Sequence, residues 1–210
     1  MKLHGYFRSA AAWRVRIALN IKGVVLEHVP HHLRKGDHRS PTFLALNPQG
    51  YVPALELDDG TVLTQSVAII EWLDETMPAP PLLPADPLTR AKARAFALVL
   101  AADTHPLQNL KVLNAWRTAG RNEEQVIGWA AQVNADGLAA CEALRAGRND
   151  RFCFGEAPGL ADICLVPQLG NARRFGVDVS AYPRLLAVEA ACMTLPAFAD
   201  AVPALQADAE

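Results

Sequence analysis

The chain lacks an apolar run approaching the about 20 residues that span a bilayer, and it has no cluster of basic residues. Arg8, Arg14 and Arg16 fall where the apolar segment of a signal peptide would lie. Lys and Arg total 20 against 22 Asp and Glu, so no basic surface for nucleic acid is indicated. We therefore expect a cytoplasmic protein that binds neither membrane nor nucleic acid.

Familiar chemical motifs are also scarce. The four cysteines form no CxxC pair and show no metal-ligand spacing, which favours reduced, packed thiols. His28, His31 and His32 fit no standard zinc site, so we expect no metal. A Gly-x-Ser-x-Gly frame and a glycine-rich phosphate loop are both absent. A serine-hydrolase elbow and a P-loop are thereby excluded.

Strand and helix signals alternate over the first 75 residues. We expect strands at residues 2–6, 24–29, 52–57 and 61–64, and helices at residues 10–21 and from residue 66 onward. Asp58-Asp59-Gly60 is a strong hairpin signal between the last two strands. The order is βαβ followed by ββα, so the first two strands should be parallel and the last two antiparallel.

The composition changes after residue 77. Residues 77–84 are rich in proline and cannot continue a helix, and beyond Pro87 the chain is alanine-rich and helix-periodic. We therefore predict an α/β domain at residues 1–77, a linker at 78–87 and an all-α domain at 88–210. Residues 206–210 are expected to fray.

Ser9 lies where the first strand passes into the first helix. The N–H groups of a helix's first turn have no intrahelical partner and carry partial positive charge, so an anion is stabilised there. Ser9 adds a hydroxyl donor and Arg8 adds a full charge. The pattern predicts an anion site at residues 8–10 without naming the anion.

Two further features of the α/β domain could serve function or structure alone. Pro53 begins a strand; a cis Val52–Pro53 bond would turn the Val52 backbone outward, whereas an ordinary trans edge proline is the common alternative. Ser66 begins a helix, either as a plain N-cap or, with Gln65, as a second carboxylate site. Two such helix starts would suit a ligand with two separated anionic groups.

The helical domain carries its own candidates. His105, Asn109 and Lys111 are expected in one long helix kinked at Pro106, with His105 and Asn109 on one face. That face could line a cleft or be merely solvated. The Arg173-Arg174 pair could form surface salt bridges, or it could clamp a carboxylate with the planar fork of arginine.

Residues 6–19, Tyr-Phe-Arg-Ser-x-x-x-Trp-Arg-Val-Arg-Ile-Ala-Leu, resemble the signature of zeta-class glutathione transferases. Five further segments resemble later signatures of that family in the family's order: 45–53, 65–73, 82–84, 105–110 and 161–168. The resemblance therefore runs the length of the chain.

The resemblance implies a thioredoxin-like α/β domain followed by an all-α domain, with glutathione as cofactor and a homodimer as the usual assembly. It implies that Ser9 donates a hydrogen bond to the glutathione sulfur and that Val52–Pro53 is cis. The other implied glutathione contacts are His38, Val52, Pro53, Gln65, Ser66, His105, Asn109, Leu110 and Lys111.

This sequence departs from the family pattern at three places. Ala10 and Ala11 stand where the family usually has Ser and Cys, so one hydroxyl rather than two would face the sulfur. Gly159 replaces a Ser or Thr N-cap, which costs a few tenths of a kcal/mol. His38 stands where some members have Gln, and both side chains can donate to a carboxylate.

The implied reaction is cis–trans isomerisation of maleylacetoacetate to fumarylacetoacetate, a step of aromatic amino-acid catabolism, by reversible thiolate addition. Arg8 and Arg174 are the expected partners of the two substrate carboxylates. Maleylpyruvate isomerisation would use the same residues. Glutathione conjugation or dehalogenation of α-halo acids is another alternative. So is a non-enzymatic binding module, against which the presence of Ser9, Gln65 and Ser66 argues.

Overall fold

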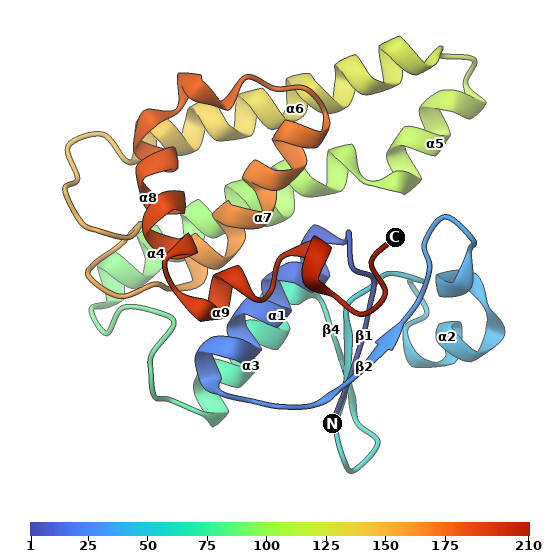
Figure 1. Ribbon diagram of the computed structural model, residues 1–210, viewed down its shortest axis with the longest axis horizontal. Helices are drawn as coiled ribbons and strands as arrows, with labels where there is room; N and C mark the ends of the chain where they lie inside the picture. Colours follow the sequence, from blue (N-terminus) through green and yellow to red (C-terminus); the bar gives the residue numbers. More distant parts are fainter. The chain divides into compact units, whose positions relative to one another are not determined.

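A computed structural model describes residues 1–210 and divides the chain into two compact units. Residues Met1–Leu82 and Thr194–Glu210 form the first unit, and Leu83–Met193 form the second. Figure 1 shows strands only in the first of these units. None of the helices combines the length and apolar character that crossing a membrane requires.

A four-stranded sheet forms the centre of the first unit, with the strand order β2-β1-β3-β4. Its strands are β1 (Lys2–Gly5), β2 (Glu27–Pro30), β3 (Ala54–Glu56) and β4 (Val62–Thr64). β1 runs parallel to β2 and antiparallel to β3, and β3 runs antiparallel to β4. The predicted βαβ-ββα order is confirmed. β2 begins at Glu27, later than the predicted residue 24.

Helices cover this sheet. They are α1 (Ala10–Lys22), α2 (Pro41–Leu46), α3 (Ser66–Thr76) and α9 (Pro196–Ala199), with short 3₁₀ helices η1 (Asp37–Arg39) and η5 (Pro203–Leu205). α1 contacts both α3 and α9, and in Figure 1 these helices lie on one side of the strands while α2 lies on the other. α1 ends at Gly23, whose φ of 65° suits a residue without a Cβ.

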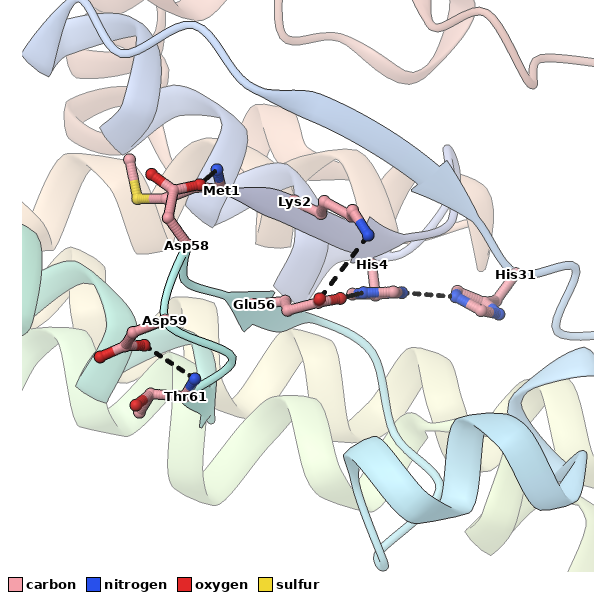
Figure 2. A network of polar contacts seen from close by, with 8 residues as sticks. All are labelled: Met1, Lys2, His4, His31, Glu56, Asp58, Asp59 and Thr61. Carbon is pink, nitrogen blue, oxygen red and sulfur yellow. Dashed lines mark hydrogen bonds and ion pairs between the residues drawn. The ribbon is translucent and has the colours of Figure 1, made fainter.

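A polar network joins β1, β3 and the residue that follows β2 (Figure 2). The buried His4 of β1 lies between two partners: its Nδ1 is 2.9 Å from Nε2 of His31, and its Nε2 is 3.0 Å from Oε2 of Glu56. His31 in turn packs its ring 4.5 Å from that of Phe43 in α2. The network therefore joins β1, β3 and the segment after β2 to α2.

The second unit is entirely helical. It contains α4 (Pro87–Leu98), a π-helical turn η2 (Val99–Thr104), η3 (His105–Gln108), α5 (Leu110–Thr118), α6 (Glu123–Leu144), α7 (Leu160–Arg174), η4 (Val179–Ala181) and α8 (Pro183–Met193). α7 is buried along most of its length and contacts α4, α6 and α8. All four cysteines are free and buried, as predicted, and burial raises the pKa of Cys141 to about 12.

The expectation of one long helix carrying His105, Asn109 and Lys111 is wrong. The helix passes through a π-helical turn and a 3₁₀ turn, and α5 starts only after Asn109, which is its N-cap. Pro106 has no N–H to continue the helical ladder, and the Asn109 side chain satisfies the first N–H groups of the new helix instead. His105 and Asn109 therefore do not share a helix face.

The predicted domain boundaries also need correction. Lys22 holds the proline-rich segment against the first unit: its Nζ donates to Asp74 (2.8 Å) and to the carbonyls of Met77 and Pro80 (2.6 Å each). The first unit thus extends to Leu82 rather than to residue 77.

Thr194–Glu210 belongs to the first unit, although its helical pattern placed it in the all-α domain. The expected fraying of residues 206–210 is not what the structure shows, because Asp208 accepts a hydrogen bond from the Phe7 N–H and Glu210 pairs with His32 and Arg34. Short-range periodicity reports helix formation but not which domain a helix packs against.

Candidate active site

The N-terminus of α1 is the first part of the site. Ser9 is the N-cap, with an extended backbone (φ −72°, ψ 115°), and its Oγ accepts a hydrogen bond from Ala12 N at 3.2 Å. That bond uses a lone pair of the hydroxyl and leaves its proton free to donate. No acidic residue lies in the first turn of α1. The first turn therefore supplies no carboxylate of its own to the positive end of the helix.

Arg8 directly precedes this N-cap. Its side chain is partly exposed and forms no ion pair. A guanidinium beside a helix N-terminus adds a full positive charge to the partial one. The pair of features fits an anion at Ser9 and a second anionic group near Arg8.

The N-terminus of α3 is the second part of the site. Ser66 is buried and is the first helical residue rather than the cap, so the plain N-cap role is wrong for it. Gln65 occupies the cap position without a side-chain capping bond, and the first turn again contains no acidic residue. These N–H groups consequently have no side-chain acceptor from the chain.

The two residues at this helix start are held by specific partners. The Ser66 Oγ accepts a hydrogen bond from Nη1 of the fully buried Arg14 at 3.4 Å. Gln65 donates from its amide to Oε1 of Gln49 at 2.9 Å. Gln65 has a φ of 70°, the one positive φ at a residue other than glycine, and such a conformation costs on the order of 1–3 kcal/mol.

Between these helix starts lies the turn before β3. The Val52–Pro53 peptide is cis, as the resemblance implied, and both residues are buried. Neither the N–H nor the C=O of Val52 makes a hydrogen bond within the chain. Val52 packs in one apolar cluster with Tyr6 and Phe7, which precede Arg8. The Val52 backbone can therefore pair with an extended peptide near Ser9.

His38 lies in η1, next to the turn at residues 47–50. Gly50 has a φ of 64°, and a Cβ there would lie 3.0 Å from the His38 carbonyl oxygen and 2.7 Å from Nη1 of Arg39. Arg39 also donates to the Gln49 carbonyl at 3.2 Å. The half-buried His38 has its Nδ1 without a hydrogen-bond partner. Burial, and then the Arg39 charge, lower the pKa of His38 below its ordinary value, which favours the neutral ring.

The contacts within the first unit join these parts into one surface. Gln49 links Gln65 to the turn that packs on His38, and Val52 packs with the residues before Ser9. Of the residues in this arrangement, sequence analysis missed the individual roles of Arg14 and Gln49. The available signal was the position of Arg14 and Arg16 on either side of Val15 within an apolar helical segment.

The second unit carries the remaining predicted residues. His105 is half-buried in η3, and Leu110 and Lys111 are exposed in the first turn of α5. The Asn109 side chain accepts from the N–H groups of Lys111 (3.0 Å) and Val112 (3.4 Å), so its oxygen caps its own helix. Their roles toward glutathione stay predictions.

Arg173 and Arg174 at the end of α7 have different environments. Arg173 forms a two-pronged pair with Glu189, at 2.6 and 2.5 Å, which confirms the surface salt bridge for this residue. The exposed Arg174 places its guanidinium 4.8 Å from the centroid of the Phe175 ring. A role of Arg174 in substrate binding stays a prediction.

Comparisons with known proteins identify the family to which both units belong. Residues 3–81 match the family described as glutathione S-transferase, N-terminal domain, and residues 128–191 match the glutathione S-transferase C-terminal domain. The chain is 50% identical to a maleylacetoacetate isomerase of Pseudomonas aeruginosa over 99% of its own length and 98% of the relative's. It is 47% identical to a maleylpyruvate isomerase of Ralstonia sp over 99% of both chains.

Solved structures give the same result. A holo structure of a maleylpyruvate isomerase described as a zeta-class bacterial glutathione transferase superposes with a TM-score of 0.97, at 46% identity over the whole of both chains. A maleylacetoacetate isomerase from Methylobacterium extorquens with bound malonate and glutathione superposes with a TM-score of 0.96, at 42% identity over the whole of both chains. The chain belongs to the glutathione S-transferase family. Its full-length relatives include maleylacetoacetate and maleylpyruvate isomerases and a zeta-class glutathione S-transferase.

Proposed function

We propose that this protein is a glutathione-dependent cis–trans isomerase that converts maleylacetoacetate to fumarylacetoacetate. The observation that carries the proposal is that the first unit combines two helix N-termini, at Ser9 and Ser66, whose first turns contain no acidic residue, with a Val52 backbone that makes no hydrogen bond within the chain. This arrangement suits a tripeptide with a thiolate, a backbone and a separate α-carboxylate.

The residues of the first unit fit glutathione part by part. The N–H groups at the start of α3, with Ser66 and Gln65, suit the γ-glutamyl carboxylate. The Val52 N–H and C=O suit the backbone of the cysteinyl residue, as an added strand would. His38 can donate to the glycyl carboxylate through its ring N–H.

Glutathione, when bound, would supply a thiolate for reversible addition to the substrate double bond, which allows rotation about that bond. Ser9 and the start of α1 stabilise that thiolate, as a helix N-terminus does for low-pKa cysteines. Arg8 pairs with one substrate carboxylate and Arg174 with the other. His105 and residues 109–111 of the second unit are further glutathione-binding residues in this proposal.

Maleylpyruvate is the second candidate substrate, because two relatives named for it align over 99–100% of both chains at 46–47% identity. Glutathione conjugation or dehalogenation of α-halo acids would use the same thiolate without a dianion. We further propose a cytoplasmic homodimer that acts in aromatic amino-acid catabolism. Light scattering that gives the mass of one 22.7 kDa chain would contradict the dimer.

The direct test is an isomerisation assay of maleylacetoacetate and maleylpyruvate, each with and without glutathione. We expect turnover only with glutathione, and the larger kcat/KM identifies the substrate. Turnover that proceeds unchanged without glutathione would rule out the mechanism. Activity confined to α-halo acids would select the conjugation alternative.

A further inference from the structure

The peptide groups on the two sides of Phe7 are held by two charged side chains. Asp208 Oδ2 accepts a hydrogen bond from the Phe7 N–H at 2.9 Å, and Arg16 Nη2 donates to the Phe7 carbonyl at 3.1 Å. Phe7 is buried and lies inside the turn in which the Ser9 N–H donates to the Tyr6 carbonyl at 3.0 Å. We refer to Arg16, Asp208 and the Phe7 backbone as the Phe7 clamp.

Arg16 is itself fixed at several points. It is buried in α1, and its Nε and Nη2 both donate to the Ala201 carbonyl, at 3.2 and 3.0 Å. Burial lowers the pKa of Arg16 to about 10, while the Asp208 charge acts in the opposite direction. The guanidinium is therefore still charged at neutral pH, and charge-assisted bonds to carbonyls are stronger than neutral ones.

The segment that carries Asp208 is held both by other parts of the first unit and by hydrogen bonds of its own. Asn20 of α1 donates to the Ala197 carbonyl at 3.1 Å, and Gln206 donates to the carbonyls of Asp200 and Val202 at 3.0 and 2.9 Å. Glu210 pairs with His32 at 2.6 Å and with Arg34 at 3.0 Å. Asp208 is thus presented by an anchored segment rather than by a free chain end.

We propose that Arg16 and Asp208 are positioning residues for the reaction: by fixing the peptides on both sides of Phe7, they set where Arg8 and the Ser9 hydroxyl point. Residues 6–8 belong to neither β1 nor α1, so no sheet or helix ladder orients the peptides of Phe7. A rotation of the Phe7 peptides would move the Ser9 hydroxyl relative to α1. Displacements of about 1 Å at a reacting group cost up to about 100-fold in rate.

This inference rests on the proposed function, because it assigns the clamp to the group that faces the glutathione sulfur. The clamp also explains how a site with Ala10 and Ala11 can work with one hydroxyl. When a single donor serves the thiolate, the direction of that donor has to be held by its surroundings.

The test compares Asp208→Ala, Asp208→Asn and the control Glu210→Gln in the full chain. Three quantities are measured: the pKa of the bound glutathione thiol from its ultraviolet thiolate absorbance, kcat and KM with substrate, and hydrogen exchange of the Phe7 amide. Thermal unfolding of each variant shows whether it is folded.

We expect Asp208→Ala to raise the pKa of the bound thiol, to speed Phe7 amide exchange and to lower kcat by about tenfold, with KM for glutathione changed less than kcat. Asp208→Asn should recover part of this loss, because its amide oxygen can still accept the Phe7 N–H. Glu210→Gln should leave the thiol pKa unchanged.

Folded Asp208→Ala protein with the thiol pKa and kcat of the parent would overturn the proposal. Equal losses of kcat in Asp208→Ala and Glu210→Gln would also overturn it, because the loss would then come from weaker attachment of the C-terminal segment and not from the Phe7 clamp. If Asp208→Ala does not fold, the same criteria are applied to Asp208→Asn. Failure of the isomerase assignment is recognised separately, because the thiol titration and the Phe7 exchange need no substrate.

Discussion

Arg173 and Arg174 are adjacent in the sequence but differ in their proposed roles. The two-pronged pair between Arg173 and Glu189 is exposed, and such surface pairs contribute only about 0–1 kcal/mol. Arg174 is the residue assigned to a substrate carboxylate. The neighbouring pair therefore offers a matched comparison on the same helix end.

We predict that Arg174→Ala lowers kcat/KM by about one to two decades, because a charge-assisted hydrogen bond contributes about 1.5–3 kcal/mol. Arg173→Ala should change kcat/KM little. Steady-state kinetics of both variants measure the difference. Equal effects of the two substitutions would remove Arg174 from the substrate site.

Gln65 combines an unfavourable backbone with a proposed ligand contact. Its φ of 70° is a conformation that glycine adopts without steric cost. Backbone strain of this kind persists where the surrounding structure imposes it, often at ligand sites. Substitution of Gln65 by glycine should therefore raise the stability of the protein and weaken its binding of glutathione.

We predict that Gln65→Gly raises the free energy of unfolding by about 1 kcal/mol, the relieved strain less the backbone entropy of glycine. The same variant should raise KM for glutathione, because the amide is lost. Gln65→Ala should raise KM equally without the gain in stability. Denaturant unfolding measures the stability of each variant, and kinetics at varied glutathione concentration measure KM. An unchanged KM for glutathione in either variant would contradict the proposed contact between Gln65 and glutathione.

At the scale of elements, α7 depends on one buried carboxylate. Gly159 is the N-cap, as predicted, but it has no side chain to cap the helix. Asp162 does so instead by accepting from Gly159 N at 2.9 Å and from Cys153 N at 2.8 Å. Burial raises the pKa of Asp162, while these bonds act to lower it. The carboxylate thus ties the preceding loop to the helix.

Asp162→Ala should lower the free energy of unfolding by about 2–5 kcal/mol, because it leaves two backbone N–H groups unsatisfied. Asp162→Asn should cost less, since one oxygen can still accept. Asp86 is an exposed N-cap in the same unit, and Asp86→Ala should cost only about 1 kcal/mol. Equal losses at Asp86 and Asp162, measured by denaturant unfolding, would contradict the role given to Asp162 in α7.

Three histidines make the first unit sensitive to acid. Burial is the main cause that lowers the pKa of His28, His31 and His38 below the ordinary 6.5, and for His31 the neighbouring His4 adds to it. The unfolded chain therefore binds these protons at higher pH than the folded chain does. The corresponding stability is complete above the unfolded pKa and is lost as pH falls through the lower, folded values.

We predict that the free energy of unfolding is nearly constant just above pH 7 and falls as pH drops below about 6.5. His31 contacts His4 in the network of Figure 2. His31→Gln should reduce the loss of unfolding free energy at acid pH, because the glutamine amide does not titrate. Denaturant unfolding across this range is the measurement, and a flat profile for the unsubstituted protein would refute the predicted loss of stability in acid.

At the scale of the whole molecule, sequence patterns predicted the helices and strands better than the contacts between distant parts of the chain. The βαβ-ββα order along the chain and the hairpin at residues 58–60 followed from local alternation and turn residues. The attachment of residues 194–210 to the first unit did not, because it depends on long-range bonds such as those from Arg16 to Ala201. The break before Asn109 was hidden because helix periodicity continues across it.

The candidate site shows the same division. Ser9 and Gln65 could be placed at helix starts from strand-to-helix transitions alone. The role of His38 came from the family resemblance alone. The residue pattern raised the roles of Val52 and Arg174 only as alternatives to an ordinary edge proline and a surface salt bridge. The Phe7 clamp could not be found from sequence, because its two charged residues are 192 positions apart, at 16 and 208.

The central claim is that the start of α1, with Ser9, holds the glutathione sulfur as a thiolate. Titration of the bound thiol tests it most directly, with Ser40→Ala as control because Ser40 is also an N-cap serine in the first unit. We predict a bound thiol pKa below the about 8.5 of a free cysteine thiol, raised by Ser9→Ala and unchanged by Ser40→Ala. A bound thiol that titrates at its free value, or that responds equally to both substitutions, would contradict the claim.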